Sequence, residues 1–339
     1  MWLLKCCNGV QLVCVFGSLI DNQFLSKLGA KMHSIFCCHK QFFNTAFMFF
    51  FLLSRKLRPM IPSLPTYQAT RYITPLREGG SLPAILDTEG GGMYVAKFRG
   101  AGQGAKALIA EIIVGSVATL LQLPTPPLAL IQITESFGRT EPDPEIQDIL
   151  RGSVGINVGA RYLEGAYNFD PVVITEIDPE LAANVVWLDA FSTNIDRTPR
   201  NPNMMFWNNG IWLIDHGAAL YFHHHWAGVT ESTPHSAFAP IRDHVLLPFA
   251  ASIPDADARL RQQILPEYIS AILALIPDEL LMDAPAGVAP AFASPDEHRQ
   301  AYQRYFQQRL GGERLFVAAA EEARQARQSQ PLAAKEYRR

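Results

Sequence analysis

The residues whose types and spacing suggest chemistry are concentrated between positions 194 and 217. Asp196 is followed five residues later by Asn201, and Asp215 begins an Asp-His-Gly sequence. Carboxylate and amide oxygens are the ligands that hard divalent cations prefer in proteins. If Asn201 and Asp215 hold a cation, Asp196 is free to accept a proton, and the three side chains together suit the transfer of a phosphoryl group.

The chain between these residues predicts how they meet. Short apolar segments over 203–207 and 211–214 flank Asn208-Asn209-Gly210, a turn sequence typical of β-hairpins. Such a hairpin reverses the chain direction. We therefore expect it to return Asp215 to the neighbourhood of Asn201.

The spacing matches the protein-kinase pattern, in which D-x-x-x-x-N is followed by Asp-x-Gly. There the first aspartate meets the acceptor hydroxyl, and the asparagine and the second aspartate bind Mg²⁺. Asn203 is an alternative for the role of Asn201, although it lies seven residues after Asp196 and begins the strand. The structural interpretation is that these polar residues only populate a loop, with Asn201 capping a turn.

Two charged residues nearer the N-terminus supply partners for this set. Lys97 ends the apolar segment Met93-Tyr94-Val95-Ala96, and Glu111 follows fourteen residues later on an expected helix. A buried ammonium needs a counter-charge, and Glu111 can provide it. The alternative is that Lys97 lies at a sheet edge with its ammonium in water, and that Glu111 lies on a solvent-exposed face of its helix. Upstream, Gly79, Gly80 and Ser81 form a short glycine loop whose backbone could approach phosphates closely.

The elements that must position these residues differ between the two halves of the chain. The first half is dominated by expected strands around one helix, and residues 136–150 form an acidic, proline-bearing surface excursion. The expected elements are a β-hairpin over 82–87 and 93–98 with its turn at 88–92, a helix over 104–123, and strands over 128–133 and 152–159.

The second half is dominated by expected helices. Apolar residues recur at helical spacing over 180–193, and most of 243–325 also fits a helix. The sequence thus predicts an α+β, two-lobe protein-kinase-like fold, with a sheet-rich N-lobe and a helix-rich C-lobe. The boundaries we assign are a leader over 1–59, the N-lobe over 60–165, the C-lobe over 166–330 and a tail over 331–339.

Two other motifs suggest different chemistry and fit it poorly. Residues 100–107 lie between a strand and a helix as a Walker loop does, but Ala105 replaces the second glycine and Ala107 replaces the Ser/Thr that would bind Mg²⁺. The run His223-His224-His225 suggests a metal site, yet neighbouring residues point in different directions. We interpret the histidine run as a packing or surface feature.

Composition separates the leader from the rest of the 339 residues. Residues 1–59 hold all five cysteines and nine of the twenty phenylalanines, with seven Lys/Arg and the single acid Asp21. The remaining residues carry 22 basic and 31 acidic side chains, so no excess of positive charge favours nucleic-acid binding. Neither a membrane span nor a secretory signal fits the leader.

We interpret residues 1–59 as a translated upstream sequence or dispensable leader, with an amphipathic membrane contact as the competing interpretation. The cysteines form the adjacent pairs Cys6-Cys7 and Cys37-Cys38 plus Cys14, without a C-x-x-C metal spacing. This distribution favours a reduced, cytoplasmic setting.

The sequence resembles the HipA-like kinases, a family related to HipA toxin kinases and more distantly to protein and phosphoinositide kinases. The similarity extends over about 70–330 and rests on four segments: Arg71–Ser81, Val95–Gly100, Asn194–Asn203 and Leu213–Leu220. Asn194 stands where protein kinases have the loop histidine, and His216 stands where they have a phenylalanine.

The resemblance implies an ATP- and Mg²⁺-dependent phosphotransferase. It implies Lys97 and the glycine loop on the phosphates, Asp196 as base, and Asn201 and Asp215 on the metal. Tyr162 and Leu163, in the connection between the lobes, are assigned to the nucleotide. The expected acceptor is a Ser/Thr hydroxyl of a protein; the alternatives are a lipid or small-molecule kinase and a nucleotide-binding pseudokinase that serves as an interaction module.

Deletion of residues 1–59 is expected to leave folding and nucleotide affinity unchanged, because the hydrophobic periodicity of the main body starts after Met60. Thermal unfolding and nucleotide titration of the full and shortened chains measure both properties. Loss of soluble expression or a large fall in Tm of the shortened chain would contradict this interpretation of the leader.

Overall fold

The computed structural model describes residues 3–5, 11–13, 63–76, 82–102, 104–139, 141–174, 176–284 and 287–329. The chain divides into two compact units, Met1–Pro59 and Met60–Arg339. In the first unit, strand β1 (Leu3–Lys5) pairs antiparallel with β2 (Gln11–Val13). All further elements that the structure describes belong to the second unit.

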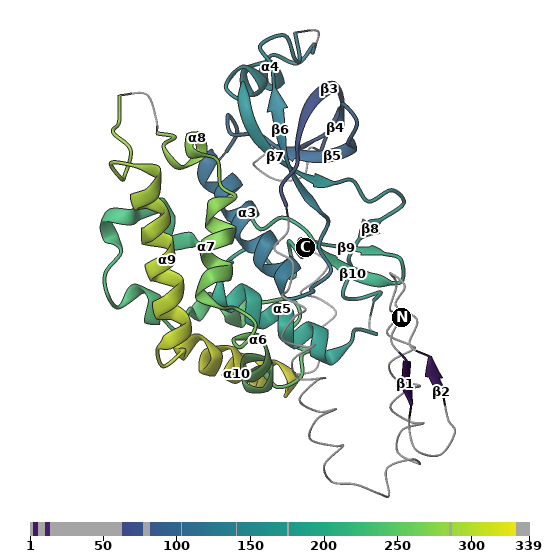
Figure 1. The fold of residues 1–339 in the computed structure, drawn as a ribbon, viewed down its shortest axis with the longest axis vertical. Coiled ribbons are helices and arrows are strands. Elements are labelled where there is room, and N and C mark those ends of the chain that lie inside the picture. The colour runs from purple at the N-terminus through teal and green to yellow at the C-terminus, as the bar shows by residue number, and fades with distance from the viewer. Residues whose placement is uncertain are drawn as a thin grey trace, which may run out of the picture. The chain divides into compact units, whose positions relative to one another are not determined.

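Five strands of the second unit form a closed barrel (Figure 1). Their order around the barrel is β3-β4-β5-β7-β6, and only the β3–β6 pairing is parallel. The strands are β3 (Thr66–Pro75), β4 (Ala84–Thr88), β5 (Gly92–Lys97), β6 (Leu128–Ile133) and β7 (Gly155–Arg161). The hairpin expected over 82–98 is β4 and β5, whereas closure of the sheet into a barrel was not predicted.

Helix α3 (Ala105–Leu120) lies between the barrel and the other helices (Figure 1). Nearly all of its residues are buried, including Glu111, because apolar side chains occur all round it. The helix ends before Pro124, as the prolines in the sequence predict. Burial on every side fixes the position of Glu111 relative to strand β5.

The excursion expected over 136–150 contains a helix that the sequence analysis missed, α4 (Pro144–Arg151). The Asp143 side chain accepts a hydrogen bond from the Glu145 amide at 3.0 Å, and Pro144 occupies the first helical position. Ile146 and Leu150, four residues apart, are the buried positions of the helix. Capping residues and one apolar pair are therefore sufficient for two helical turns in an otherwise polar segment.

The remaining elements form a small sheet and a group of helices. The sheet has the order β10-β9-β8, and its β9–β10 hairpin confirms the one expected over 203–214. The elements are β8 (Tyr167–Asn168), α5 (Pro179–Phe191), β9 (Met204–Trp207), β10 (Gly210–Leu213), the 3₁₀ helices η1 (Tyr221–Gly228), η2 (Thr233–His235) and η3 (Ala239–Asp243), α6 (Ile253–Leu260), α7 (Pro266–Ala274), α8 (Asp278–Leu281), α9 (Pro295–Gly311) and α10 (Leu315–Gln328).

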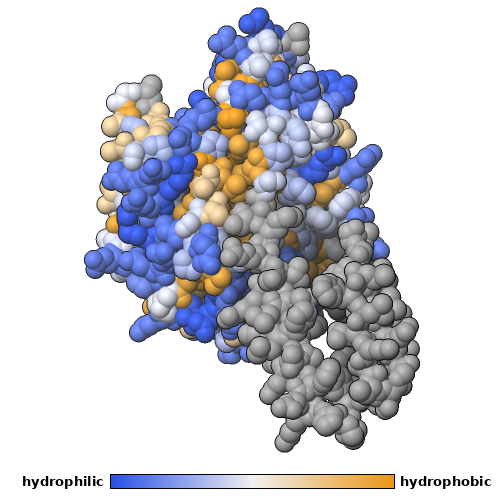
Figure 2. Space-filling view, in the orientation of Figure 1, coloured by the Kyte–Doolittle hydropathy of each residue, from blue (hydrophilic) through white to orange (hydrophobic). Residues whose placement is uncertain are grey.

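Helix α5 is the centre of the helical part. Its Trp187 stacks on Phe191, and Phe191 in turn contacts Phe306 of α9 and Phe316 of α10. Figure 2 shows polar residues over much of the visible face and apolar residues gathered where the barrel meets the helices. The mixed α+β composition predicted from the sequence is confirmed. Over the described ranges, no helix has both the length and the apolarity to cross a bilayer.

Candidate active site

Lys97, Glu111 and Asp215 meet at one point. Lys97 ends strand β5, and its Nζ bonds to Glu111 Oε1 and donates to Asp215 Oδ1 at 2.5 Å. The side chains of Lys97 and Glu111 are 14% and 6% exposed, and that of Asp215 is 33% exposed. Burial opposes the charged form of Lys97, but the two carboxylates outweigh it and raise the pKa of the ammonium. The lysine is therefore held as a cation.

The backbone at Asp215 turns sharply to make this contact. Asp215 has a φ of 55°, in the left-handed region that aspartate tolerates better than most residues. The Gly217 amide donates to Asp215 Oδ1 at 3.2 Å. A Cβ on Gly217 would lie 3.2 Å from Lys97 Nζ. A side chain here would crowd the lysine, so glycine keeps the space beside the ammonium open.

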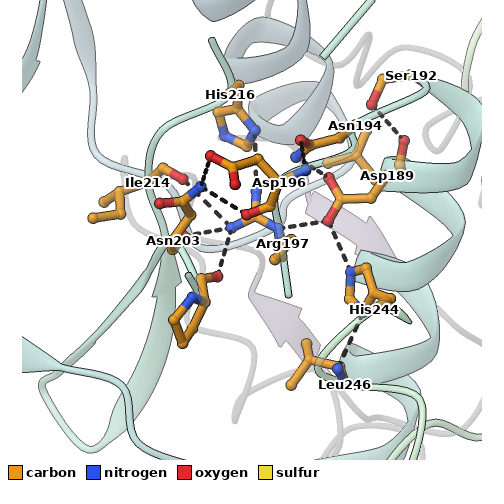
Figure 3. Close-up of polar contacts among 12 residues, drawn as sticks. Asp189, Ser192, Asn194, Asp196, Arg197, Asn203, Ile214, His216, His244 and Leu246 are labelled. Carbon is orange, nitrogen blue, oxygen red and sulfur yellow. Dashed lines mark hydrogen bonds and ion pairs between the residues drawn. The ribbon is translucent and has the colours of Figure 1, made fainter. Parts of the chain in front are cut away.

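Asp196 is held by two asparagines of its own loop. Asn201 Nδ2 donates to Asp196 Oδ2 at 2.8 Å. Asn203 Nδ2 donates to the same oxygen at 3.2 Å and to the Asp196 backbone oxygen at 3.0 Å (Figure 3). Since the amide nitrogens of both asparagines face Asp196, their Oδ1 atoms are the ones left for a cation.

The hairpin register determines which asparagine adjoins Asp215. Met204 pairs with Leu213, and the Ile214 amide donates to the Asn203 carbonyl at 3.0 Å. Asn203 therefore lies opposite the residue that precedes Asp215. Asn201, two residues earlier and exposed, lies beyond this pairing.

Asp189, a buried carboxylate on the last turn of α5, binds side chains of the loop that carries Asp196. Its Oδ2 accepts from Arg197 Nε at 2.5 Å and from His244 Nε2 at 2.9 Å, and its Oδ1 accepts from Asn194 Nδ2 at 2.9 Å (Figure 3). Burial alone would raise the pKa of Asp189, but the Arg197 charge and these hydrogen bonds hold it far below its usual value. Asn194 Oδ1 accepts from the Asp196 amide at 3.1 Å, so the network reaches Asp196 directly.

Arg197 extends this network to the segment after the hairpin. Its guanidinium donates to the backbone oxygens of Asn203 and, at 3.4 Å, of Ile214, and its Nη2 donates to His216 Nδ1 at 3.3 Å. Burial, assisted by the Arg197 charge, lowers the pKa of His216 to about 3, so the imidazole is neutral and accepts through Nδ1. One buried arginine thus contacts both segments that carry the candidate acids.

The connection between barrel and helices contains Tyr162 and Leu163. The Tyr162 amide donates to the Met93 carbonyl at 3.0 Å, and Leu163 is buried. Trp207 Nε1 donates to the Glu164 carbonyl at 3.0 Å, which ties hairpin β9–β10 to this connection. Both residues selected from the sequence therefore lie on the segment that joins the two parts.

Two further sets of residues were candidates from the sequence, the short glycine loop and the histidine run. Gly79, Gly80 and Ser81 fall outside the described residues. His223 Nδ1 shares a hydrogen bond of 2.8 Å with the Tyr302 hydroxyl, and the His224 carbonyl accepts from Lys106 at 2.9 Å, so these histidines pack against helices. In the part of the chain that the structure describes, no three His, Cys, Asp or Glu residues are grouped to hold a metal ion.

The sequence analysis missed Asp189 and Arg197. The signal for Asp189 was a lone carboxylate in the apolar run Val185–Phe191, where a charge needs a buried partner. Arg197, directly after Asp196, was the nearest candidate for that partner. Identifying the pair needed the turn that folds the loop back over the end of α5.

Residues 70–310, most of the length of the chain, match a family model described as HipA-like kinase. No curated protein matches the chain.

Replacement of Asp189 by Asn is expected to lower the free energy of unfolding by about 3–5 kcal/mol, because it leaves Arg197 buried without its counter-charge. The new side-chain amide would also place an N–H group beside hydrogen-bond donors of the wild-type carboxylate, which would then lack an acceptor. Urea unfolding measures the change. The matched control is Asp243→Asn, which removes an exposed carboxylate 3.7 Å from Arg242 and should cost less than about 1 kcal/mol. Equal effects at the two positions would contradict the structural role of Asp189.

Proposed function

This chain belongs to the HipA-like kinase family, and we propose that it transfers the γ-phosphoryl group of ATP, with Mg²⁺, to a Ser/Thr hydroxyl of a protein. The observation that carries the proposal is the meeting of Lys97 with both Glu111 and Asp215. Phosphoryl transfer depends on positioning and on charge stabilisation rather than on covalent chemistry by the protein, and this cluster provides both.

The proposed layout has two lobes, an N-lobe over 60–165 that contains the barrel and a C-lobe over 166–330 that contains the helices. ATP lies between them, with its base at Tyr162 and Leu163. Gly79, Gly80 and Ser81 approach the phosphates, as the sequence predicts. The cysteine distribution supports a cytoplasmic setting for the reaction.

Lys97 is the proposed phosphate-binding residue. Without nucleotide, its charge is neutralised by Glu111 and Asp215. With nucleotide, Glu111 keeps the ammonium oriented while the phosphates take part of its charge. Asp215 would then be available to hold Mg²⁺.

The donors around Asp215 fit Mg²⁺, which prefers oxygen ligands and is usually bound by only one or two protein groups together with phosphate oxygens. Bound there, Mg²⁺ would neutralise charge on the phosphates during transfer. Asp215 supplies one oxygen. For the second, the hairpin register supports Asn203, which lies opposite Ile214, over Asn201, the choice from sequence spacing.

Asp196 is the proposed base. Both asparagine amides donate to its Oδ2, so Oδ1 is left to orient the acceptor hydroxyl and accept its proton. The amide donors fix the orientation of the carboxylate. The network below it, from Asp189 through Asn194, fixes the backbone from which this carboxylate projects.

The direct test is incubation of the full chain with labelled ATP and Mg²⁺, alone and with a cell lysate. Transfer of label to the chain or to a lysate protein supports the kinase. Binding of ATP without transfer to any acceptor would favour a nucleotide-binding interaction module instead, and transfer to a lipid fraction would favour a lipid kinase.

Asp196→Asn is expected to keep binding of ATP with Mg²⁺ while lowering turnover by about 10²–10⁴-fold, the range for loss of a positioned general base. Asp215→Asn removes charge from the proposed metal site, so it should weaken Mg²⁺-dependent nucleotide binding as well as turnover. Nucleotide titrations with and without Mg²⁺, combined with single-turnover transfer, separate the two. Full activity of Asp196→Asn, or unchanged Mg²⁺ dependence of Asp215→Asn, would refute the assigned roles.

The two asparagines can be distinguished in the same assay. Asn203→Ala should raise the Mg²⁺ concentration needed for half-maximal transfer more than Asn201→Ala does, because Asn203 adjoins the residue before Asp215. Asn201→Ala removes one hydrogen bond to Asp196 and Asn203→Ala removes two, so turnover at saturating Mg²⁺ measures the effect of that loss separately. The opposite ranking would assign the metal to Asn201.

A further inference from the structure

Arg309, on the next-to-last helix α9, is one of the most buried cations in the described part of the chain, with 1% of its surface exposed. Its Nε donates to the Phe191 carbonyl at 2.6 Å and its Nη2 to the Ala190 carbonyl at 2.5 Å. Its Nη1 donates to the carbonyls of Pro234 at 2.9 Å and Ser236 at 3.2 Å. One guanidinium therefore connects the end of α5 with η2 and the residue that follows it.

The charge of Arg309 is balanced without an acid. Across the described residues, no carboxylate lies within ion-pair distance of it. Ala190 and Phe191 are the last two residues of α5, where unpaired carbonyls form the negative end of the helix dipole. The Phe316 ring lies 4.5 Å from the Arg309 Cζ atom and adds a cation–π contact. All the hydrogen-bond acceptors of Arg309 are backbone oxygens, so the arginine fixes the position of the main chain.

The segment that Arg309 holds leads directly into the candidate base. Residues 192 and 193 are the whole connection between Phe191 and Asn194, whose side chain binds both Asp189 and the Asp196 amide. On the other side, the Ser192 carbonyl accepts from the Leu220 amide at 2.7 Å. Displacement of the end of α5 would therefore be passed on to the loop of Asp196.

The backbone of this connection is strained. Thr193 has a φ of 52°, an outlier for a β-branched residue. Such a conformation costs about 1–3 kcal/mol and persists only where the surroundings enforce it. Asp189 and Asn194 hold one end of the connection. Arg309 holds the other end, through the carbonyl of Phe191.

We propose that Arg309 is a positioning residue for the transfer reaction, which holds the strained connection at Thr193 so that Asp196 keeps its working geometry. This inference rests on the proposed function, because it concerns the loop of the proposed base. A displacement of the order of 1 Å at a reacting group can cost about 10²-fold in rate. Arg309 thus couples helix α9 to catalysis without touching either substrate.

The test compares Arg309→Lys with Arg304→Lys, a matched change at an exposed arginine on the same helix. Lysine keeps the charge and loses the planar fork that contacts two segments at once. Arg309→Lys should lower turnover by about 10–100-fold with ATP affinity within about twofold of wild type. Hydrogen exchange should accelerate in residues 190–197 and 234–236, while exchange in helix α3 stays unchanged. Arg304→Lys should change none of these.

A second variant reports on the strain itself. Glycine adopts a positive φ at no steric cost, so Thr193→Gly in the Arg309→Lys chain should recover part of the lost turnover. A lack of recovery of turnover would contradict the role of the strained connection at Thr193. If Arg309→Lys does not fold, Phe316→Leu, which removes the ring beside the guanidinium together with its contacts to Trp187 and Phe191, should also lower turnover and accelerate exchange at 190–197.

The outcomes separate this proposal from the proposed function. Wild-type turnover and wild-type hydrogen exchange in Arg309→Lys would overturn the positioning role of Arg309. So would a parallel loss of ATP affinity and turnover without faster exchange at 190–197, which would assign Arg309 to general stability. If the wild-type chain transfers no phosphoryl group, the proposed kinase reaction is refuted. Unchanged hydrogen exchange at 190–197 in Arg309→Lys would then overturn the positioning role of Arg309 as well. Faster exchange there would show that Arg309 still positions the loop of Asp196.

Discussion

The ammonium of Lys97 joins three parts of the molecule that lie far apart in the sequence. It comes from strand β5, meets Glu111 on helix α3, and contacts Asp215 after strand β10. A buried charge is tolerated only when it is paired, so the barrel, the central helix and the hairpin must all reach this point. The absence of a side chain at Gly217 fits the same requirement, because a Cβ there would crowd the ammonium.

A second set of buried charges surrounds the end of helix α5. Asp189 binds Arg197 there, and the carbonyls of the last turn bind Arg309. The Asp189–Arg197 ion pair contacts the loop of Asp196. The contact of Arg309 with the carbonyls joins α5 to helix α9. The apolar stacking of Trp187 and Phe191 makes α5 a rigid support for both. The polar loops of the candidate site are therefore fixed by electrostatics, and the position of those charges is fixed by hydrophobic packing.

The sequence was informative where the signal was local. The β-hairpin of the barrel, helix α3 and the Asn-Gly hairpin follow from turn residues, helical periodicity and prolines. Closure of the barrel was not predictable in this way, since β3 and β6 pair across a long sequence separation. The choice between Asn201 and Asn203 also depended on register, because a shift of two residues leaves the local pattern the same. The partners of Asp189 and Arg309 are distant in sequence or lie in the backbone, so only the tertiary structure shows what these two charges bind.

The parallel pairing of β3 with β6 implies an order of events during folding. Thr66 lies opposite Leu130 across this seam, so β3, although made first, has to wait for helix α3 and strand β6 to be synthesised. Closing such a long loop costs entropy, and parallel pairing is somewhat weaker than antiparallel pairing. Within β3 itself, Ala69 is the one buried residue. This seam is therefore the weakest point of the barrel, and opening it leaves β3, β4, β5, β7 and β6 as a continuous antiparallel sheet.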